Sequence, residues 1–466
     1  MPLFKKPIEQ EFFNLRLRAG RPMTELEFYA KELTDWETSP ERREMIDGDR
    51  YYTGDHDILK RQRTAIGPDG KLIVIENLPN NRIVDNQYAK HVDQKANYLL
   101  GQPISFSCEN DDYAAEVKKV LGMRFMRTLK SAGVECLNAG ISWLYPYYNK
   151  NGELAFRVFP GYEIMPFWAD AAHTELDSAL RLYPVEVYYG TEKKIVKKVD
   201  LFTLEGVTTY IFENGVLTPD TEKQAYVKVK DSKGNEQPLN WERFPLIPIK
   251  YNPKEVPLIR RGRSLQDAIN LLQSDFVNNM EEDVRNTVLV LKNYDGQDLG
   301  EFRRNLTTYG AIKVRTVEGT DGGVDSLEIS VNSENYKTVL ELLKKALIEN
   351  LRSYDAKDDR LSGTPNQMNI QSMYCDIDLD ANAMETELQA SFEEILWFVN
   401  TYLANTGKGS YESEDITVIF NRDILINESE AIDNCSKSVG IISDETIVAM
   451  HPWVDDPAAE LERLQK

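Results

Sequence analysis

The sequence has few of the residues from which metal sites, disulfide frameworks and hydrolytic centres are built. Four cysteines and four histidines are spread over 466 residues, without a CxxC pair or a Cys/His cluster. This pattern predicts reduced thiols and argues against a zinc site. No stretch approaches the ~18 apolar residues of a membrane span, and no secretory signal is readable at the N-terminus. We therefore expect a protein without a cofactor and without a membrane segment.

Basic charge is also scarce. The chain has 55 Lys and Arg against 76 Asp and Glu, a formal net charge of −21. Affinity for nucleic acid comes chiefly from neutralised phosphates, so this charge has the wrong sign for a protein that grips DNA or RNA. Two interpretations remain open: no contact with nucleic acid, or a contact in which tight binding would be a defect. The length predicts two or three domains.

Three long helices are predicted between residues 264 and 403. In residues 264–284 and 335–354, apolar side chains recur three or four positions apart, the spacing of one helical face. The first of these faces contains Leu265, Ile269, Leu272, Phe276, Met280 and Val284. Residues 370–403 have a helical pattern that is longer than the usual helix of a globular protein. A small β-rich lobe, residues 287–332, separates the first two helices. The arrangement predicts an elongated structure rather than a compact domain with a pocket.

The N-terminal half divides into a helical part and a β-rich part. Thr24 with Glu27 forms a capping box, Ser39-Pro40 marks a second helix start, and residues 82–103 form a helix that stops at Gly101. We expect His91 and Lys95, within that helix, on a solvated edge. Residues 104–251 contain two short helices and then a meander of strands, whose aromatic side chains we expect in the packing core.

One acidic segment suggests an enzymatic alternative. Asp376, Asp378, Asp380 and Glu387 match the first, third, fifth and twelfth positions of an EF-hand loop, but Ala381 replaces the glycine of its turn. The segment also lies inside a continuous helical pattern, which favours an acidic helix face. Asp376 and Asp380, one turn apart, remain weak candidates for an adventitious divalent ion. No Ser/His/Asp or Cys/His arrangement can be assembled from neighbouring positions, so we do not expect an enzyme.

Several stretches resemble the portal proteins of tailed bacteriophages, and most closely the family from long-tailed (siphovirus) phages of Gram-positive bacteria. They occur in family order over nearly the whole chain: RYYTGDHDILKRQR, NNRIVDNQYAKHVDQKANYLLGQPISF, GISWLYPYYNKNGELAFRVFP, VLVLKNYDGQDLGEFRRNLTTYGAIKV, WFVNTYLANTGKG and ISDETIVAMHPWVDDPAAELERL. The resemblance implies a ring-forming α+β portal fold. Its parts would be a mixed wing, a two-helix stem, a small α/β clip, a long wing helix and a helical crown.

The same resemblance implies the domain boundaries. Residues 1–255 would be the wing, 256–286 and 334–355 the two stem helices, and 287–333 the clip. Residues 356–369 would form the tunnel loop, 370–404 the long wing helix, 405–427 a wing strand return, and 428–466 the crown. The charged helical pattern at the end of the sequence predicts a truncated crown.

The function implied by the resemblance is that of a portal, or head–tail connector. About twelve copies would form a ring at one capsid vertex of the virion, assembled in the bacterial host cytoplasm. Double-stranded DNA would pass through the ring during packaging and ejection without tight binding. The partners would be the terminase large subunit, a head-completion or adaptor protein, and the major capsid and scaffolding proteins. A divalent-metal-dependent nucleic-acid enzyme and a non-conducting oligomeric adaptor are the alternatives.

Helix dimensions and charge agree with a conduit. About twelve helices packed ~8–10 Å apart leave an opening of roughly 25–28 Å, wider than a duplex of order 20 Å. Residues 264–333 contain twelve acidic and six basic residues, so a wall built from them would repel phosphate. The site residues expected from the resemblance are Lys357, Arg360, Asn366 and Gln367 in the tunnel loop; Glu341, Lys344 and Lys345 on the channel wall; and Asp295, Arg303 and Arg304 at the clip docking face.

Overall fold

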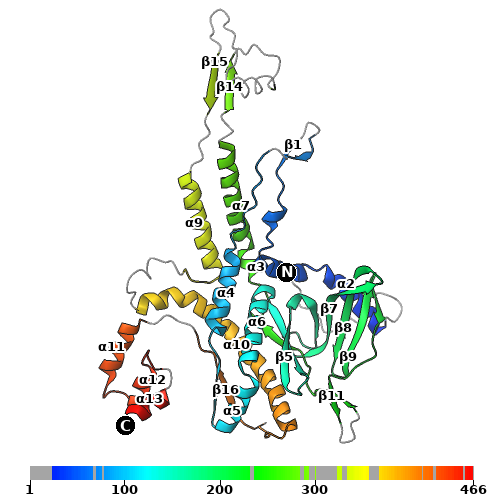
Figure 1. The fold of residues 1–466 in the computed structure, drawn as a ribbon, viewed down its shortest axis with the longest axis vertical. Coiled ribbons are helices and arrows are strands. Elements are labelled where there is room, and N and C mark those ends of the chain that lie inside the picture. Colours follow the sequence, from blue (N-terminus) through cyan, green and yellow to red (C-terminus); the bar gives the residue numbers. More distant parts are fainter. Residues whose placement is uncertain are drawn as a thin grey trace, which may run out of the picture. The chain divides into compact units, whose positions relative to one another are not determined.

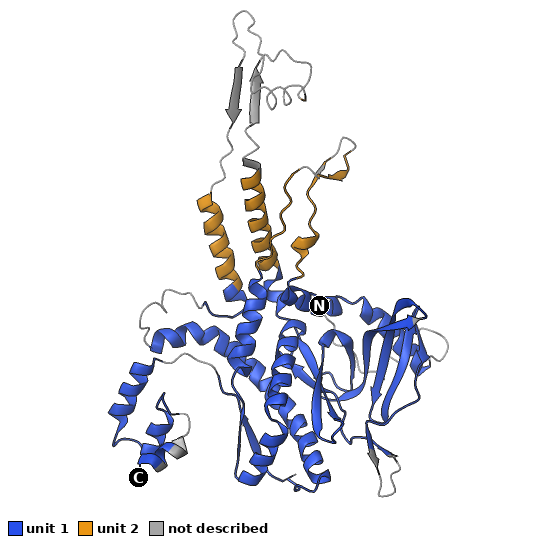
Figure 2. Ribbon diagram, viewed as in Figure 1, with its two compact units in different colours: residues 1–54, 86–263, 348–466 blue, residues 55–85, 264–347 orange. Residues whose placement is uncertain are grey.

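The computed structural model describes residues 24–66, 70–75, 78–230, 236–283, 288–292, 300, 323–327, 333–355, 367–411, 413–422, 427–454 and 457–464. The chain divides into two compact units, coloured in Figure 2. Unit 1 comprises residues 1–54, 86–263 and 348–466, and unit 2 comprises residues 55–85 and 264–347. The expected α+β class is confirmed, because both helices and sheets are abundant. Among the described residues, no helix is both long and apolar enough to cross a membrane.

Unit 1 begins with helices that start where the sequence predicts them. Helix α2 (Glu25–Glu37) is capped by the Thr24–Glu27 box, and α3 (Pro40–Thr53) by the Ser39 side chain. Helices α4 (Gln87–Leu100), α5 (Asp111–Val120) and α6 (Met123–Ala139) follow, with the short strand β3 (Ser105–Cys108) between α4 and α5. The helix predicted from residue 82 thus begins only at Gln87, since Asn86 caps it.

The predicted meander is a five-stranded antiparallel sheet in the order β10-β9-β8-β7-β6. Its strands are β6 (Ile164–Trp168), β7 (Leu176–Tyr189), β8 (Glu192–Thr203), β9 (Gly206–Glu213) and β10 (Val216–Pro219). A second sheet has the order β13-β4-β5, from β4 (Ile141–Tyr148), β5 (Leu154–Phe159) and β13 (Ile247–Lys250). Two short pieces complete this part of the chain, the 3-10 turn η2 (Gly161–Glu163) and the hairpin of β11 (Val227–Lys230) and β12 (Glu236–Leu239).

The aromatic side chains of this region form packing core, as expected. On one side of the five-stranded sheet, Phe28, Leu33 and Trp36 of α2 pack with Phe167 and Val199, as the position of α2 against this sheet in Figure 1 illustrates. A second cluster joins the two sheets through side chains such as Trp143, Phe159, Trp168 and Phe202. Apolar burial of this extent is the main stabilising contribution to unit 1.

The C-terminal part of unit 1 is dominated by one helix. Helix α10 (Gln367–Asn405) has 39 residues without interruption, slightly longer than the predicted 370–403. It packs on β13 and α4 and is followed by β16 (Ile416–Ile419), which pairs antiparallel with β3. The predicted helical end of the chain consists of α11 (Glu428–Ser438), α12 (Asp444–Ala449) and α13 (Pro457–Leu464).

Unit 2 contains the predicted helix pair. Helix α7 (Ile259–Asp283), whose first five residues belong to unit 1, begins earlier than the predicted residue 264. Helix α9 (Ser333–Asn350) meets it through the rings of Phe276 and Tyr336, with centroids 4.9 Å apart. The unit also has the 3-10 turn η1 (Asp57–Lys60), the hairpin of β1 (Thr64–Ile66) and β2 (Leu72–Val74), and the antiparallel pair β14 (Val288–Lys292) and β15 (Gly323–Leu327).

Candidate functional site

The segment that leads into α7 is held to the body of unit 1 by its backbone. The N–H of Tyr251 donates to the carbonyl of Gly140 at 3.0 Å, and the N–H of Leu258 donates to the carbonyl of Leu137 at 2.9 Å. Gly140 has a φ of +81°, and a Cβ at this position would overlap the carbonyl oxygen of Glu255. Only glycine combines this left-handed conformation with so close an approach.

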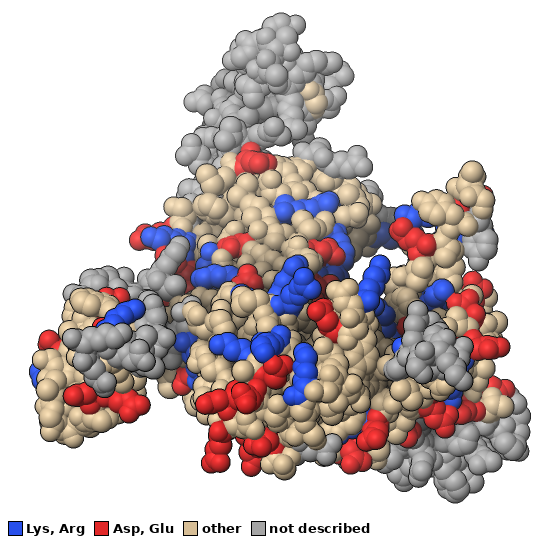
Figure 3. Space-filling view, turned by 60° about the horizontal axis from the view of Figure 1, so that its bottom comes forward, with Lys and Arg blue, Asp and Glu red and all other residues tan. Residues whose placement is uncertain are grey.

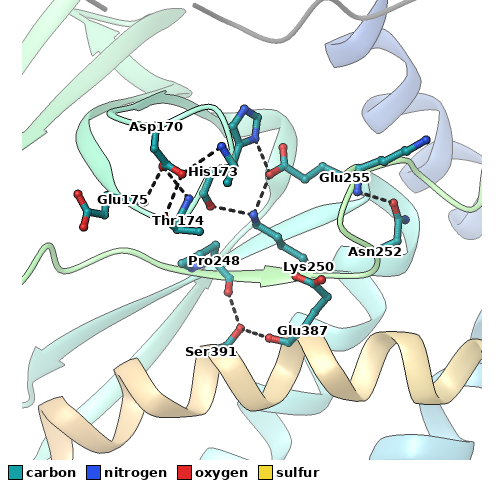
Figure 4. Close-up of polar contacts among 12 residues, drawn as sticks. Asp170, His173, Thr174, Glu175, Pro248, Lys250, Asn252, Glu255, Glu387 and Ser391 are labelled. Carbon is teal, nitrogen blue, oxygen red and sulfur yellow. Dashed lines mark hydrogen bonds and ion pairs between the residues drawn. The ribbon is translucent and has the colours of Figure 1, made fainter. Parts of the chain in front are cut away.

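An ionic cluster fixes the same segment, as Figure 4 shows. The Glu255 carboxylate accepts from His173 Nδ1 at 2.8 Å and lies 3.2 Å from Lys250 Nζ. Burial acts to raise the pKa of Glu255, but the hydrogen bond from His173 and the charge of Lys250 outweigh it, so the pKa lies below its usual value. Asn252 closes the turn, because its side-chain oxygen accepts the N–H groups of Lys254 and Val256.

A second ionic cluster is centred on Asp380 of α10 and is almost completely buried. Its carboxylate accepts from Lys95 Nζ at 2.7 Å and from the Tyr251 hydroxyl at 2.6 Å. Arg261 Nη1 donates to its other oxygen at 3.1 Å, and Arg352 Nη1 lies 3.7 Å away. Burial opposes the charge of Asp380, but Lys95 and its neighbours outweigh burial and lower the pKa of this carboxyl group. Asp380 is therefore held as an anion.

The Asp380 cluster joins elements that are distant in the sequence. Lys95 comes from α4, Arg261 from the first turn of α7, and Arg352 from just beyond the end of α9. Lys95 Nζ also donates to the carbonyl of Arg352 at 2.9 Å, and Arg352 adopts a φ of +51°. The beginning of α7 and the end of α9 are thus both tied to α10 within unit 1. Since removing one partner of a buried ion pair is strongly destabilising, the cluster fixes where the two helices begin and end.

Two predictions about these residues are wrong. His91 and Lys95, expected on a solvated edge, are 1% and 5% exposed. Lys95 contacts Asp380 of α10 and the carbonyl of Arg352, just beyond the end of α9. Asp380, a weak candidate metal ligand, has its oxygens occupied by Lys95, Tyr251 and Arg261, whereas Asp376 is exposed.

The EF-hand alternative also fails. Asp378 forms an ion pair with Arg422 and accepts from the Tyr98 hydroxyl at 3.0 Å, and α10 runs through the segment as unbroken helix. An EF-hand loop must turn sharply at its sixth position, which a helix cannot do. Within the described parts of the chain, no group of three or more His, Cys, Asp or Glu side chains is arranged to hold a metal ion.

In unit 2 the most buried stripe of α7 is polar, although the sequence predicts an apolar face. Gln266, Asn270, Ser274 and Asn278, each four residues after the last, are at most 2% exposed, whereas Met280 of the predicted face is 53% exposed. The stripe binds the extended residues 81–85. The N–H groups of Asn81, Ile83 and Asp85 donate to Asn278 at 2.7 Å, Ser274 at 3.0 Å and Asn270 at 3.0 Å.

This polar zipper, defined as the four α7 side chains with residues 81–85, rests on a match of repeats. Four residues advance a helix by ~6 Å, and two residues advance an extended chain by ~6.6 Å, so successive helical turns meet alternate N–H groups. The zipper explains why the helix predicted from residue 82 starts only at Gln87: the N–H groups before it are taken by α7. The oxygen of Asn270 is occupied by Asp85 and Gln266, so its amide nitrogen donates to His56 Nδ1, 2.7 Å away.

The site residues expected from the resemblance are only partly within the described residues. On α9, Glu341 and Lys345 are exposed, and Lys344 lies 2.7 Å from Asp85. Gln367 is the first residue of α10, and its N–H donates to Glu430 at 2.9 Å. Lys357, Arg360 and Asn366 of the tunnel loop, and Asp295, Arg303 and Arg304 of the clip, lie outside the described residues. In Figure 3, Lys and Arg side chains are interspersed with Asp and Glu over the visible face.

The sequence contained a signal for one of the two missed features. The polar zipper appears in the sequence as amide or hydroxyl side chains at strict four-residue spacing, Gln266, Asn270, Ser274 and Asn278. Such a stripe on a helix indicates a polar partner rather than solvent when it is this regular. Lys95 and Asp380, by contrast, are 285 residues apart, and no local pattern connects them.

Comparison with known proteins places the chain in one family. The family model described as phage portal protein, SPP1 Gp6-like, matches residues 36–466. The portal protein of Bacillus phage SPP1 is 30% identical over 426 residues, which cover 91% of this chain and 83% of the relative. The portal protein of Clostridium phage phiCD119 is 27% identical over 435 residues, covering 91% and 92%.

Similarity to solved structures is weaker. A chain from the neck of a native gene transfer agent particle, computed with C12 symmetry, is 12% identical with a TM-score of 0.38, over 78% of this chain and 89% of that one. A TM-score this low supports no argument of its own, whereas the family match covers nearly the whole chain. The chain therefore belongs to the SPP1 Gp6-like family of phage portal proteins, and it is a structural protein of the phage rather than an enzyme.

Proposed function

We propose that about twelve copies of this chain form a closed head-to-tail ring at one capsid vertex, and that double-stranded DNA passes through its centre during packaging and ejection. The observation that carries the proposal is the attachment of α7 and α9 to α10 through Asp380. A channel wall must keep its helices in register while DNA moves past them. Anchoring both helices at a buried ionic cluster supplies that rigidity.

In this proposal the parts of the chain have separate roles. Residues 1–255 and 405–427 form the wing, with 370–404 as its long helix. Residues 256–286 and 334–355 form the stem that lines the channel, 287–333 the clip, 356–369 the tunnel loop, and 428–466 the crown. The ring is a virion component assembled in the host cytoplasm, where the major capsid and scaffolding proteins are further partners.

The charge of α7 supports passage of DNA without capture. Residues 264–283 contain five acidic residues and neither Lys nor Arg. An acidic wall repels phosphate, whereas contacts that neutralise phosphates would bind the duplex tightly. Glu341 and Lys345 of α9 add charges of both signs, and the ion pair of Lys344 with Asp85 weakens Lys344 as a phosphate contact.

Two regions of the proposal have distinct partners. The tunnel loop, through Lys357, Arg360, Asn366 and Gln367, touches the DNA backbone transiently. The clip, through Asp295, Arg303 and Arg304, docks the terminase large subunit during packaging and a head-completion or adaptor protein afterwards.

Electron microscopy of the purified full-length protein tests the ring directly. We expect rings with a central opening, and a strictly monomeric protein under assembly conditions would refute the proposal. Packaging assays with Lys357→Ala and Arg360→Ala test the loop, with Lys437→Ala, an exposed lysine of α11, as the control. We expect the loop variants to assemble normally but to package DNA more slowly than the control. Normal packaging by both would remove the loop from the mechanism.

A further inference from the structure

Unit 2 has very little apolar core of its own. Among its described residues, the buried hydrophobic side chains are Ile58, Ile269 and Leu347, while His56 and the zipper side chains of α7 are buried polar groups. Large apolar side chains of the same unit are exposed: Leu59, Ile66, Leu72, Ile73, Val74, Leu271, Met280, Val339 and Leu342. A protein surface seldom leaves so many apolar side chains uncovered unless another molecule covers them.

The most exposed of these side chains belong to the β1–β2 hairpin. Ile66 and Leu72 face each other across the two strands and are 77% and 72% exposed. Val74 shares their side of the hairpin, and Ile73 lies on the opposite side, because side chains alternate along a strand. Within the described residues, β1 and β2 pair only with each other. An isolated two-stranded hairpin is marginal in water, so this one needs a surface to pack on.

Unit 2 also offers a surface of matching character. Val339 and Leu342, three residues apart on one side of α9, are 44% and 61% exposed. The charges are complementary. Residues 60–75, which contain the hairpin, have four basic residues and one acidic residue, whereas residues 264–283 of the neighbouring helix α7 have five acidic residues and no basic one. One such pair, Arg61 with Asp275 at 2.8 Å, already forms within the chain, and three basic residues of the arm and four acidic residues of α7 lie outside that pair. Such a pairing of opposite charge steers association and fixes its register.

We propose that residues 60–75 of one copy dock onto the α7–α9 pair of the next copy, where the hairpin covers Val339 and Leu342. The contact joins two different surfaces of the same chain, as a ring requires, since a head-to-tail interface leaves each copy with one free surface of each kind until the ring closes. The inference rests on the proposed ring and names the surfaces that hold it together. A second copy is the favoured occupant because unit 2 carries both the basic apolar arm and the acidic apolar surface that it fits.

Directed cross-linking tests the contact in the full chain. In a Cys375→Ser background, which removes an exposed cysteine, protein with Leu72→Cys is mixed with protein carrying Leu342→Cys, assembled, and treated with a short bismaleimide. We expect a cross-linked dimer in the mixture but not in either protein alone. The matched control replaces Leu72→Cys by Ile195→Cys, on an apolar residue of β8 that is 70% exposed, close to the 72% of Leu72. This control should give no cross-link.

A second measurement keeps failure of the contact distinct from failure of the ring. Ile66→Ser with Leu72→Ser should raise the protein concentration at which rings half-dissociate by at least about tenfold, with Ile195→Ser unchanged. Because these side chains are exposed in the single chain, the variant should fold normally. Rings in wild-type protein without the cross-link, or rings of undiminished stability in the serine variant, would overturn the docking proposal and leave the conduit intact. Absence of rings in wild-type protein would refute the proposed function itself.

Discussion

Replacing Asp380 by asparagine removes the only anion that faces Lys95 among the contacts described for that lysine. The lysine is 5% exposed, burial already lowers its pKa, and in the variant it would face two arginines, Arg261 and Arg352, without a counter-charge. Breaking a buried pair in this way costs about 3–5 kcal/mol, because the ammonium group keeps the carbonyl of Arg352 but loses its counter-charge. We use the lower end, about 3 kcal/mol, since asparagine still accepts from the Tyr251 hydroxyl.

Urea unfolding followed by tryptophan fluorescence measures this loss, since Trp143 and Trp168 are buried in unit 1. The control is Asp376→Asn, one turn earlier on α10 and exposed, which should change stability by less than about 0.5 kcal/mol. Adding Lys95→Met to Asp380→Asn should recover about half of the loss, because the unpaired cation is removed. An Asp380→Asn protein as stable as the control variant would show that the cluster does not anchor the helices.

The same pair predicts a pH dependence. The folded pKa of Asp380 lies below its unfolded value, so its contribution to stability is complete above the unfolded pKa and is lost as the pH falls through the folded pKa. The free energy of unfolding should therefore be larger for wild-type protein than for Asp380→Asn above the unfolded pKa. This difference should shrink as the pH falls through the folded pKa. A stability difference that stayed constant to the most acidic pH would contradict this account.

Three further perturbations follow from the structure. Gly140→Ala should destabilise unit 1 by about 2 kcal/mol or more in urea unfolding, because it adds strain at positive φ to a collision with the Glu255 carbonyl. Asn270→Ala should cost about 1–3 kcal/mol and speed hydrogen exchange at the Asp85 amide, which loses its acceptor; unchanged exchange would refute the zipper. Burial, then the nearby acidic groups, raise the pKa of Glu135 to about 7 from 4.5. The contribution of Glu135 to the free energy of unfolding is therefore complete below about pH 4.5 and is lost as the pH rises to about 7. In Glu135→Gln, the free energy of unfolding should change less with pH across that window.

Local sequence patterns determined much of the fold. Periodicity and caps predicted α2, α3, α5, α6, α7, α9 and the continuous α10, and alternating β-rich segments predicted the meander of unit 1. These features depend on interactions within a few residues, such as the Thr24–Glu27 box. They are readable because helices and strands repeat every 3.6 and 2 residues.

Only the tertiary structure decided which side of each helix is buried and against what. Residues 82–86 have helical periodicity, yet α7 binds the N–H groups of Ile83 and Asp85, so α4 starts at Gln87. Lys95 and Asp380 read as charged positions on two separate helices. They become a buried pair because α4 and α10 pack together. Each charge needs the other, because burying an unpaired charge away from water is costly. A charge in a sequence has no fixed energetic value until the fold determines whether water or another charge faces it.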